Sequence, residues 1–356
     1  MKKSIYINGL GSISSQKTYD NTHFLNEVIH YNNTVLPAVS PNYKDYIVPS
    51  KARRMANGVK MGITAAKIAL KNANHPTINA IITGTGMGCI IDTEKFVGSI
   101  IDNDEQYLTP TPFIQSTHNT VGGQISIDIN CKGYNFTYVQ ASNSFESALL
   151  DASLQLELNE AETILVGGID ELSDHSIKIH KKINHIKGVA TASNQLLNST
   201  TKGAIFGEGA NFFVLSNKRQ DYTYAKLLGT SMHNTLKKEH LNEVLIAFLS
   251  AHNLTLENLD SVVLGYNGDV EFDSFYNTFT SLLKAHTGIL YYKHLTGEYH
   301  TASAFALYTA SQIIRHQQIP EDIIKRKSLK TKQSIILLYN QYRGEHHSFT
   351  LLKSCE

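Results

Sequence analysis

The side chain best placed for nucleophilic chemistry in this sequence is Ser142, which stands just before a helix-like segment at residues 144–158. A serine hydroxyl becomes a useful nucleophile only when an adjacent base takes its proton. His118 and His300 are the histidines considered for that role, and the reaction would be acyl transfer or thioester hydrolysis. The alternative is a small polar helix cap, since serine and asparagine are both favoured at helix amino termini. The capping interpretation is preferred, because no base is identified beside Ser142.

Metal chemistry is not indicated by the histidines or the cysteines. The sixteen histidines are scattered, and the adjacent pair His346 and His347 lacks the i, i+4 helical spacing with a carboxylate that a zinc site needs. Cys89, Cys131 and Cys355 show no CxxC spacing and are too few for a disulfide framework. We therefore expect no bound metal and free, buried thiols.

The composition excludes several classes of protein. The 356 residues carry a net charge of +1, which argues against nucleic-acid binding through bulk charge. Hydrophobic residues make up 42% of the chain and charged residues 18%, and no stretch approaches the roughly 20 apolar residues that span a bilayer. The first residues are typical of a strand and a turn, not of a signal peptide, so we expect a cytoplasmic location.

Strand-like and helix-like segments alternate along the whole chain, which predicts an α/β fold. These elements must position the residues considered above. In the first part of the chain, strands are expected at residues 4–10, 80–83, 134–139, 163–166 and 211–215, and helices at 53–73 and 144–158. In the second part, helices are expected at residues 241–251, 272–284 and 301–316, and strands at 261–264 and 334–338.

Eight short motifs follow one another over nearly the whole chain. They are INGLGSIS at 7–14, RRM at 53–55, GTGMG at 84–88, TPFIQSTHNTVGGQISIDINCKGYNF at 111–136, ASNSFESALLDA at 141–152, LVGGIDEL at 165–172, GEGA at 207–210 and a loop at 293–297 entering an Ala-rich helix. Singly, LVGG and GTGMG are weak signals, because any α/β sheet needs glycines where strands turn into helices. In this order, the motifs together resemble the β-ketoacyl-acyl-carrier-protein synthases of the elongating type.

The resemblance implies an α/β, thiolase-like fold in which two similar halves form an αβαβα layered core. The N-terminal half would span residues 1–220 and carry the nucleophile position, and the C-terminal half would span residues 221–356 and carry the loops of two catalytic histidines. In the family, a cysteine at the amino end of a buried helix attacks an acyl thioester, and the histidines promote decarboxylation of malonyl-carrier protein and stabilise the enolate.

All three catalytic positions of the family are replaced in this sequence. The resemblance places Ser142 at the cysteine, Asn267 at the first histidine and Glu298 at the second, while Lys293 keeps the family's lysine. His300 is the rival for the second histidine position if the loop contains an insertion. A hydroxyl ionises less readily than a thiol, and an amide neither takes nor gives a proton at neutral pH. A carboxylate at residue 298 would repel a malonyl carboxylate and the forming enolate. The Asn-Gly pair also fits an ordinary turn.

The loop that gates the acyl pocket in the family is replaced as well. Where the family has Asn-Ser-Phe-Gly-Phe-Gly-Gly, this chain has a polar and bulky segment with Asn340, Tyr342, Arg343 and Gly344. Loss of the small glycines removes the backbone freedom and the close approach that an oxyanion hole requires. Glu208 of the GEGA motif is retained.

These features favour a non-condensing, chain-length-factor-like pseudoenzyme that forms a heterodimer with an active ketosynthase. The pathway would be type II polyketide or polyene synthesis, including aryl-polyene or flexirubin-type pigments, or fatty-acid-like synthesis. Acyl groups would arrive on a phosphopantetheinyl acyl-carrier protein, with no other cofactor. The alternatives are an active acyltransferase or thioester hydrolase using Ser142, and a homodimeric module that binds acyl groups or the carrier protein. Chain-length factors often have Gln at the nucleophile position, whereas Gln140 lies two residues early here.

Overall fold

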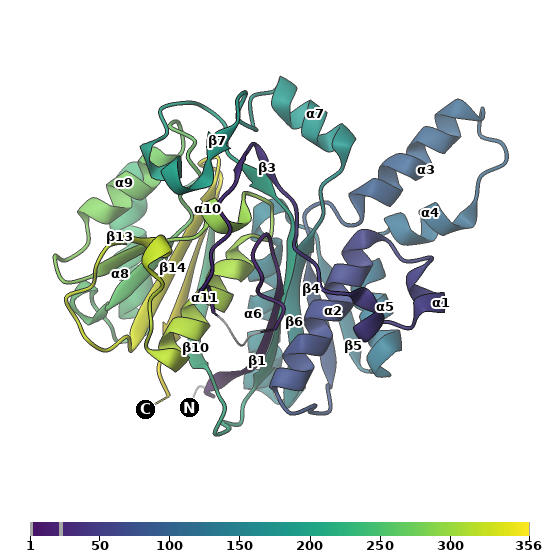
Figure 1. Cartoon of the computed structure of the whole chain (residues 1–356). Helices are drawn as coiled ribbons and strands as arrows, with labels where there is room; N and C mark the ends of the chain where they lie inside the picture. The colour runs from purple at the N-terminus through teal and green to yellow at the C-terminus, as the bar shows by residue number, and fades with distance from the viewer. Residues whose placement is uncertain (1–2, 21–23, 356) are drawn as a thin grey trace.

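One mixed sheet of eleven strands runs through the part of the chain that the computed structural model describes, residues 3–20 and 24–355. The strand order is β13-β12-β11-β14-β15-β10-β1-β9-β6-β4-β5 (Figure 1). The first-half strands are β1 (Ile5–Ile13), β4 (Ala80–Gly84), β5 (Tyr134–Tyr138), β6 (Thr163–Asp170) and β9 (Gly209–Ser216). The second-half strands are β10 (Ala225–Asn234), β11 (Ser261–Leu264), β12 (Gly288–Tyr291), β13 (Ile324–Arg326), β14 (Ile335–Tyr342) and β15 (His346–Lys353).

The two halves of this sheet repeat the same topology. In the first half, β1, β9, β6, β4 and β5 are joined by two antiparallel and then two parallel pairings. In the second half, β10, β15, β14, β11 and β12 follow in the same sequence of directions. A short pairing of Ile5–Ile7 with residues 225–227 connects the halves. The predicted fold of two similar halves is confirmed, whereas a division into domains at residue 220 stays a prediction.

Helices lie between the two half-sheets and on their outer faces (Figure 1). Helix α6 (Ser144–Leu158) contacts β4 and β6 on one side and β10 on the other, and α11 (Ser303–His316) contacts β14 as well as β1 and β9. Outside, α2 (Asn57–Asn72) and α5 (Thr120–Ile129) cover the first half, and α8 (Leu241–Ser250) and α9 (Asp273–Ser281) cover the second. The result is the predicted αβαβα layering.

The alternating side chains of the strands explain why both faces of each half-sheet are apolar. On β9, Phe213 and Leu215 pack into the central layer, while Phe212 and Val214 pack under α2. Successive strand residues point to opposite faces, so strands buried on both faces are apolar throughout. The glycines of the INGLG motif serve close packing, because a Cβ atom at Gly11 would lie 2.2 Å from the Ala65 carbonyl oxygen of α2.

The remaining elements form the surface around these layers. The other helices are α1 (Pro49–Ala52), α3 (Ile90–Asp102), α4 (Pro110–Ser116), α7 (Asp174–Lys182) and α10 (Lys293–Thr296), and two short ladders join β2 (Asn32–Asn33) to β7 (Thr191–Ala192) and β3 (Val35–Leu36) to β8 (Phe206–Gly207). Helices α3 and α4 project from the layered core (Figure 1). Among the described helices, none combines the length and the apolar character that crossing a bilayer requires.

The element predictions differ from the structure chiefly at element ends. The helix predicted over residues 53–73 is wrong at its start, because α2 begins at Asn57 and α1 ends before Arg53. The backbone N–H of Ala56 donates to Gln115 Oε1 at 3.1 Å, which holds the break between them. Strands β1, β6 and β14 run several residues beyond their predicted ends, because antiparallel neighbours extend the pairing.

Candidate functional site

A buried ion pair lies where the resemblance places the second catalytic histidine. Lys293 Nζ lies 2.8 Å and 2.7 Å from the two carboxylate oxygens of Glu298, and Asn267 Nδ2 donates to Glu298 Oε2 at 2.7 Å. The Lys293 side chain is 0% exposed and that of Glu298 is 2% exposed. The structure therefore brings together three of the predicted site residues. Lys293 compensates the charge of Glu298 inside the protein, and the expected repulsion of a malonyl carboxylate by Glu298 stays a prediction.

The rival residue, His300, lies elsewhere. Its ring centroid is 5.3 Å from that of Tyr342, and a Cβ atom at Gly86 would lie 2.3 Å from the imidazole. Gly86 thus lets the GTGMG turn approach this ring closely. Glu298, and not His300, is the neighbour of Asn267, so the two positions expected to carry histidines form one contact.

The turn that presents Asn267 is fixed from both sides. Asp273, the first residue of α9, accepts hydrogen bonds from the N–H groups of Asn267 at 3.1 Å and Gly268 at 2.9 Å. Burial raises the pKa of Asp273 to about 7, against the lowering effect of these hydrogen bonds. From the other side, Lys187 Nζ donates to the Gly268 carbonyl at 2.8 Å and to Thr201 Oγ1 at 2.9 Å. No periodic pattern or motif in the sequence singles out Lys187.

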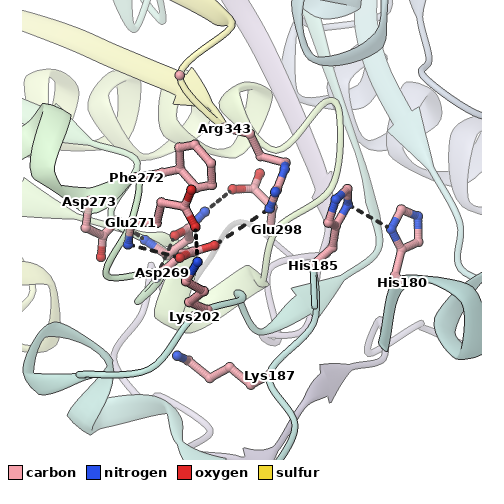
Figure 2. A network of polar contacts seen from close by, with 12 residues as sticks. His180, His185, Lys187, Lys202, Asp269, Glu271, Phe272, Asp273, Glu298 and Arg343 are labelled. Carbon is pink, nitrogen blue, oxygen red and sulfur yellow. Dashed lines mark hydrogen bonds and ion pairs between the residues drawn. The ribbon is translucent and has the colours of Figure 1, made fainter. Parts of the chain in front are cut away.

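The predicted gate loop is corrected to the tight turn of the β14–β15 hairpin. Gly344 has φ +70°, and its N–H donates to Gln341 Oε1 at 2.8 Å. Arg343 lies over the Phe272 ring at 4.6 Å, with its guanidinium 3.8 Å from Asp269 Oδ2 (Figure 2). Strand pairing continues to the turn, where Tyr342 pairs with His346, and residues 346–353 also pair with β10 on their other side.

Of two further residues predicted for the gate, Asn340 is buried and Tyr342 is partly buried. Asn340 Oδ1 accepts a hydrogen bond from the Tyr292 hydroxyl at 3.2 Å. Burial raises the pKa of Tyr342 well above its ordinary value, so this hydroxyl stays neutral. Tyr342 and His300 line a cavity of about 30 Å³. A cavity of this size holds about one water molecule and no acyl chain.

Ser142 has a partner that the sequence did not identify. Its hydroxyl oxygen lies 2.9 Å from His346 Nδ1. Ser142 belongs to the 3-10 turn η2 (Ala141–Asn143), and His346 is the first residue of β15. The expected base, His118 or His300, is therefore wrong. The capping interpretation is wrong too, because the cap residue of α6 is Asn143, without a side-chain cap hydrogen bond.

Carboxylates of the GEGA and LVGGIDEL motifs hold the backbone around the site by hydrogen bonds. Glu208 accepts hydrogen bonds from the N–H groups of Ala38 at 3.2 Å and Leu172 at 3.1 Å, so it ties two segments together. Asp170, which ends β6, was not singled out from the sequence. Its carboxylate accepts from the N–H groups of Gly86 at 2.8 Å and Thr301 at 2.9 Å, which joins the GTGMG turn to the start of α11.

Within residues 3–20 and 24–355, no group of three or more His, Cys, Asp or Glu side chains is arranged so that it could hold a metal ion. His180 and His185 do meet, with their Nδ1 atoms 3.3 Å apart (Figure 2). The absence of a cofactor stays a prediction. All three cysteines are free, but only Cys89 is fully buried, so the expectation of buried thiols is corrected for the other two.

Comparison with known proteins gives concordant matches. The family model for the β-ketoacyl synthase N-terminal domain matches residues 38–221. The 3-oxoacyl-[acyl-carrier-protein] synthase 2 of Staphylococcus aureus is 24% identical over 203 residues, 53% of this chain and 50% of the relative, so the chain spans about half the length of the curated relatives it matches.

Similar solved structures extend the match in fold to the whole chain. The ishigamide ketosynthase/chain length factor has a TM-score of 0.82 at 16% identity, with 100% of both chains covered. A ketosynthase in complex with its chain length factor from Xenorhabdus doucetiae has a TM-score of 0.77 at 14% identity, covering 99% of this chain and 98% of the other. These structures have the thiolase-like layering described above.

Proposed function

This chain belongs to the β-ketoacyl synthase family, and on that premise we propose that it is a chain-length-factor-like subunit that does not itself condense acyl groups. It would pair with an active ketosynthase and receive an acyl-carrier protein, in type II synthesis of a polyketide or polyene, such as an aryl-polyene or flexirubin-type pigment, or of a fatty-acid-like product. The observation that carries the proposal is the closed cluster of Asn267, Lys293 and Glu298 at the positions expected for the catalytic histidines and their lysine.

The chemistry of this cluster is unsuited to condensation. Decarboxylative condensation needs a thiolate to hold the acyl chain and groups that donate protons or hydrogen bonds to the enolate. The Asn267 amide cannot exchange a proton at neutral pH, and both Glu298 oxygens accept from Lys293. The cavity beside Tyr342 leaves no room for an acyl chain. These features support a subunit that keeps the frame of the family without its reaction.

The edge of the sheet supports a protein partner. Strand β5 ends the eleven-stranded sheet, so one side of its backbone is unpaired in the described part of the chain. Phe136 on this strand is 45% exposed and stacks against Tyr134. The neighbouring face of α6 adds exposed leucines, which are Leu150, Leu154 and Leu158. An unpaired strand with exposed apolar side chains is a ready site for pairing with another chain.

The named assemblies of similar structures guide the choice of partner. One of them is a ketosynthase in complex with its chain length factor, and another is the ishigamide ketosynthase/chain length factor. A ketosynthase of the same fold would present a matching edge strand. We therefore propose the heterodimer ahead of a homodimer, because a non-condensing subunit needs an active partner to take part in synthesis.

Co-expression tests this function. The chain is produced together with a ketosynthase that has the Cys and both His residues, and the mixture is analysed by size-exclusion chromatography and mass measurement. We expect a stable one-to-one complex, and no β-ketoacyl product when this chain alone meets acyl- and malonyl-carrier protein. A condensation product from the isolated chain contradicts the proposal. A homodimer that binds carrier protein and ignores every ketosynthase supports the binding-module alternative instead.

A further inference from the structure

A cavity of about 340 Å³ opens at the β13 end of the eleven-stranded sheet, the end opposite to β5 (Figure 1). Its lining residues come from β12 and β13, from the segment that follows α11, and from the basic segment of residues 325–332. It is separate from the cluster of Asn267, Lys293 and Glu298, because none of these three residues lines it. Pockets that bind small molecules usually enclose about 300–1000 Å³, so this cavity has room for a small ligand.

One wall of the cavity is apolar. It is formed by Leu290 of β12, which is buried, and by Ile319 and Ile324, which are partly buried against the central layer. Leu329 of the basic segment also lines the cavity and is 74% exposed, so an aliphatic side chain stands at the rim. An aliphatic group of a ligand would remove apolar surface from water on both partners. The wall therefore favours a ligand with a small aliphatic group.

Two opposite charges at this cavity have no partner. Lys327 and Glu321 both line it and are exposed. Among the residues that the structure describes, neither side chain forms an ion pair or a hydrogen bond. The neighbouring ammonium of Lys330 is compensated instead, since its Nζ atom lies 2.9 Å from Asp260 Oδ1. Lys327 and Glu321 are thus available to a ligand that carries one negative and one positive group.

The basic segment is held in place around the cavity by hydrogen bonds to the body of the protein. Ser328 Oγ donates to the Asp260 carbonyl at 2.9 Å and accepts from the Lys330 N–H at 3.1 Å. The N–H of Leu329 donates to the His286 carbonyl at 3.0 Å. A site that is already ordered loses less conformational entropy on binding than a mobile loop does.

We propose that this cavity binds a free α-amino acid with an aliphatic side chain, such as leucine. The carboxylate of the ligand is bound by the Lys327 ammonium, and its ammonium group by the Glu321 carboxylate. The side chain of the ligand packs against Leu290, Ile319 and Ile324. A fatty acid satisfies only the lysine and an alkylamine only the glutamate, so a zwitterion is the ligand that meets both charges. The site needs no ketosynthase and is independent of the proposed subunit function.

The test is calorimetric titration of the full-length protein with four related compounds. These are leucine, isocaproate, which lacks the ammonium group, isoamylamine, which lacks the carboxylate, and glycine, which lacks the aliphatic side chain. We expect leucine to bind at least about 10-fold more tightly than glycine, because the aliphatic side chain is buried on binding. We expect it to bind at least about 3-fold more tightly than isocaproate or isoamylamine, because each of these forms only one ion pair.

Three variants assign the contacts. Lys327→Gln should bind leucine no more tightly than it binds isoamylamine, and Glu321→Gln should no longer distinguish leucine from isocaproate. The matched control is Lys332→Gln, because Lys332 belongs to the same basic segment but does not line the cavity. This control should bind leucine with the wild-type affinity. All three side chains are exposed, so thermal melting should show folded variants.

Three results would overturn the proposal. The first is a folded wild-type protein that shows no saturable binding of leucine. The second is equal affinity for leucine in the wild type, Lys327→Gln and Glu321→Gln. The third is isocaproate or isoamylamine bound as tightly as leucine, since the site would then recognise only one charge. Association with a ketosynthase is measured separately, and none of these three results bears on it.

Discussion

At the scale of single residues, the buried pair of Lys293 and Glu298 determines what the site can do. Two opposite charges without solvent contact are tolerated here because each has hydrogen-bonding partners, including Asn267. Desolvation offsets most of the attraction within such a pair, but loss of one partner leaves a bare charge in the interior. The pair is thus a local constraint on folding at the position where the resemblance places a catalytic histidine.

Removal of one charge should therefore cost more than removal of both. We expect Glu298→Ala to lower the free energy of unfolding by about 3–5 kcal/mol, and the double variant Lys293→Met, Glu298→Leu to lower it by less than Glu298→Ala alone. Urea denaturation measures both. The control is the exposed pair of Lys202 and Glu271, 3.0 Å apart, where Glu271→Ala should cost at most about 1 kcal/mol. Equal losses in the buried and exposed pairs would contradict this account.

Glu146 offers a second residue-scale prediction, about pH. This α6 carboxyl is 2% exposed, accepts a hydrogen bond from Ser348 Oγ at 2.9 Å, and has its pKa raised by burial. Its folded pKa exceeds the unfolded value of about 4.3, so its contribution to stability is complete below that pH and is lost as pH rises towards the folded pKa. Glu146→Gln should therefore be more stable than wild type at pH 8, and the gain should vanish at pH 4.

Thermal melting across this pH range gives the measurement for Glu146→Gln. The control is Glu162→Gln, because Glu162 is exposed and has its pKa lowered, chiefly by its hydrogen bond from Lys218. The control variant should show no gain at pH 8. A Glu146→Gln variant whose gain in stability is the same at both pH values would argue against a neutral carboxyl in the folded protein.

At the scale of elements, the β14–β15 hairpin positions both Arg343 and His346. Its turn depends on Gly344, which has φ +70° and where a Cβ atom would lie 2.9 Å from the Phe275 ring. We expect Gly344→Ala to destabilise the protein by about 1–2 kcal/mol, as measured by denaturant unfolding. The control is Gly98→Ala in helix α3, where a Cβ atom meets nothing within 4 Å and should stabilise by about 0.5–1 kcal/mol. If both variants lose stability, the result contradicts a specific requirement for glycine at position 344 of the turn.

At the scale of the whole molecule, the free edge at β5 is the feature that favours assembly. Phe136→Asp places a charge among exposed apolar side chains at the end of the sheet. We expect this variant to lose at least about 10-fold in affinity for the proposed ketosynthase partner, because charge at an edge strand opposes pairing. Ile246→Asp is the control, since Ile246 is 40% exposed on α8, which covers the other half-sheet. Sedimentation or calorimetric titration compares them, and equal binding by both variants would place the interface elsewhere.

Local patterns in the sequence alone predict much of the secondary structure and the family of this protein. The helix over Ser144–Leu158 and the strand over Ser261–Leu264 have their predicted bounds, because each has a consistent apolar period and clear neighbouring turns. The ordered motifs identified the family, since their glycines are required by packing, as Gly11 against α2 illustrates. At the positions where the resemblance expects a catalytic cysteine and two histidines, the sequence has Ser142, Asn267 and Glu298, and these residue types alone exclude a thiolate and an imidazole there.

Only the tertiary structure decided what these residues contact. Asn267 and Glu298 come from separate loops, 31 residues apart, and Ser142 reaches His346 across 204 residues. No local period or propensity encodes such pairs, because they arise when the second half-sheet packs against the central helices. The fold also pairs Glu298 with Lys293 and makes the predicted loop the turn of a hairpin. Which residues meet over long sequence separations depends on packing, and that is why the types of the site residues follow from the sequence but their contacts do not.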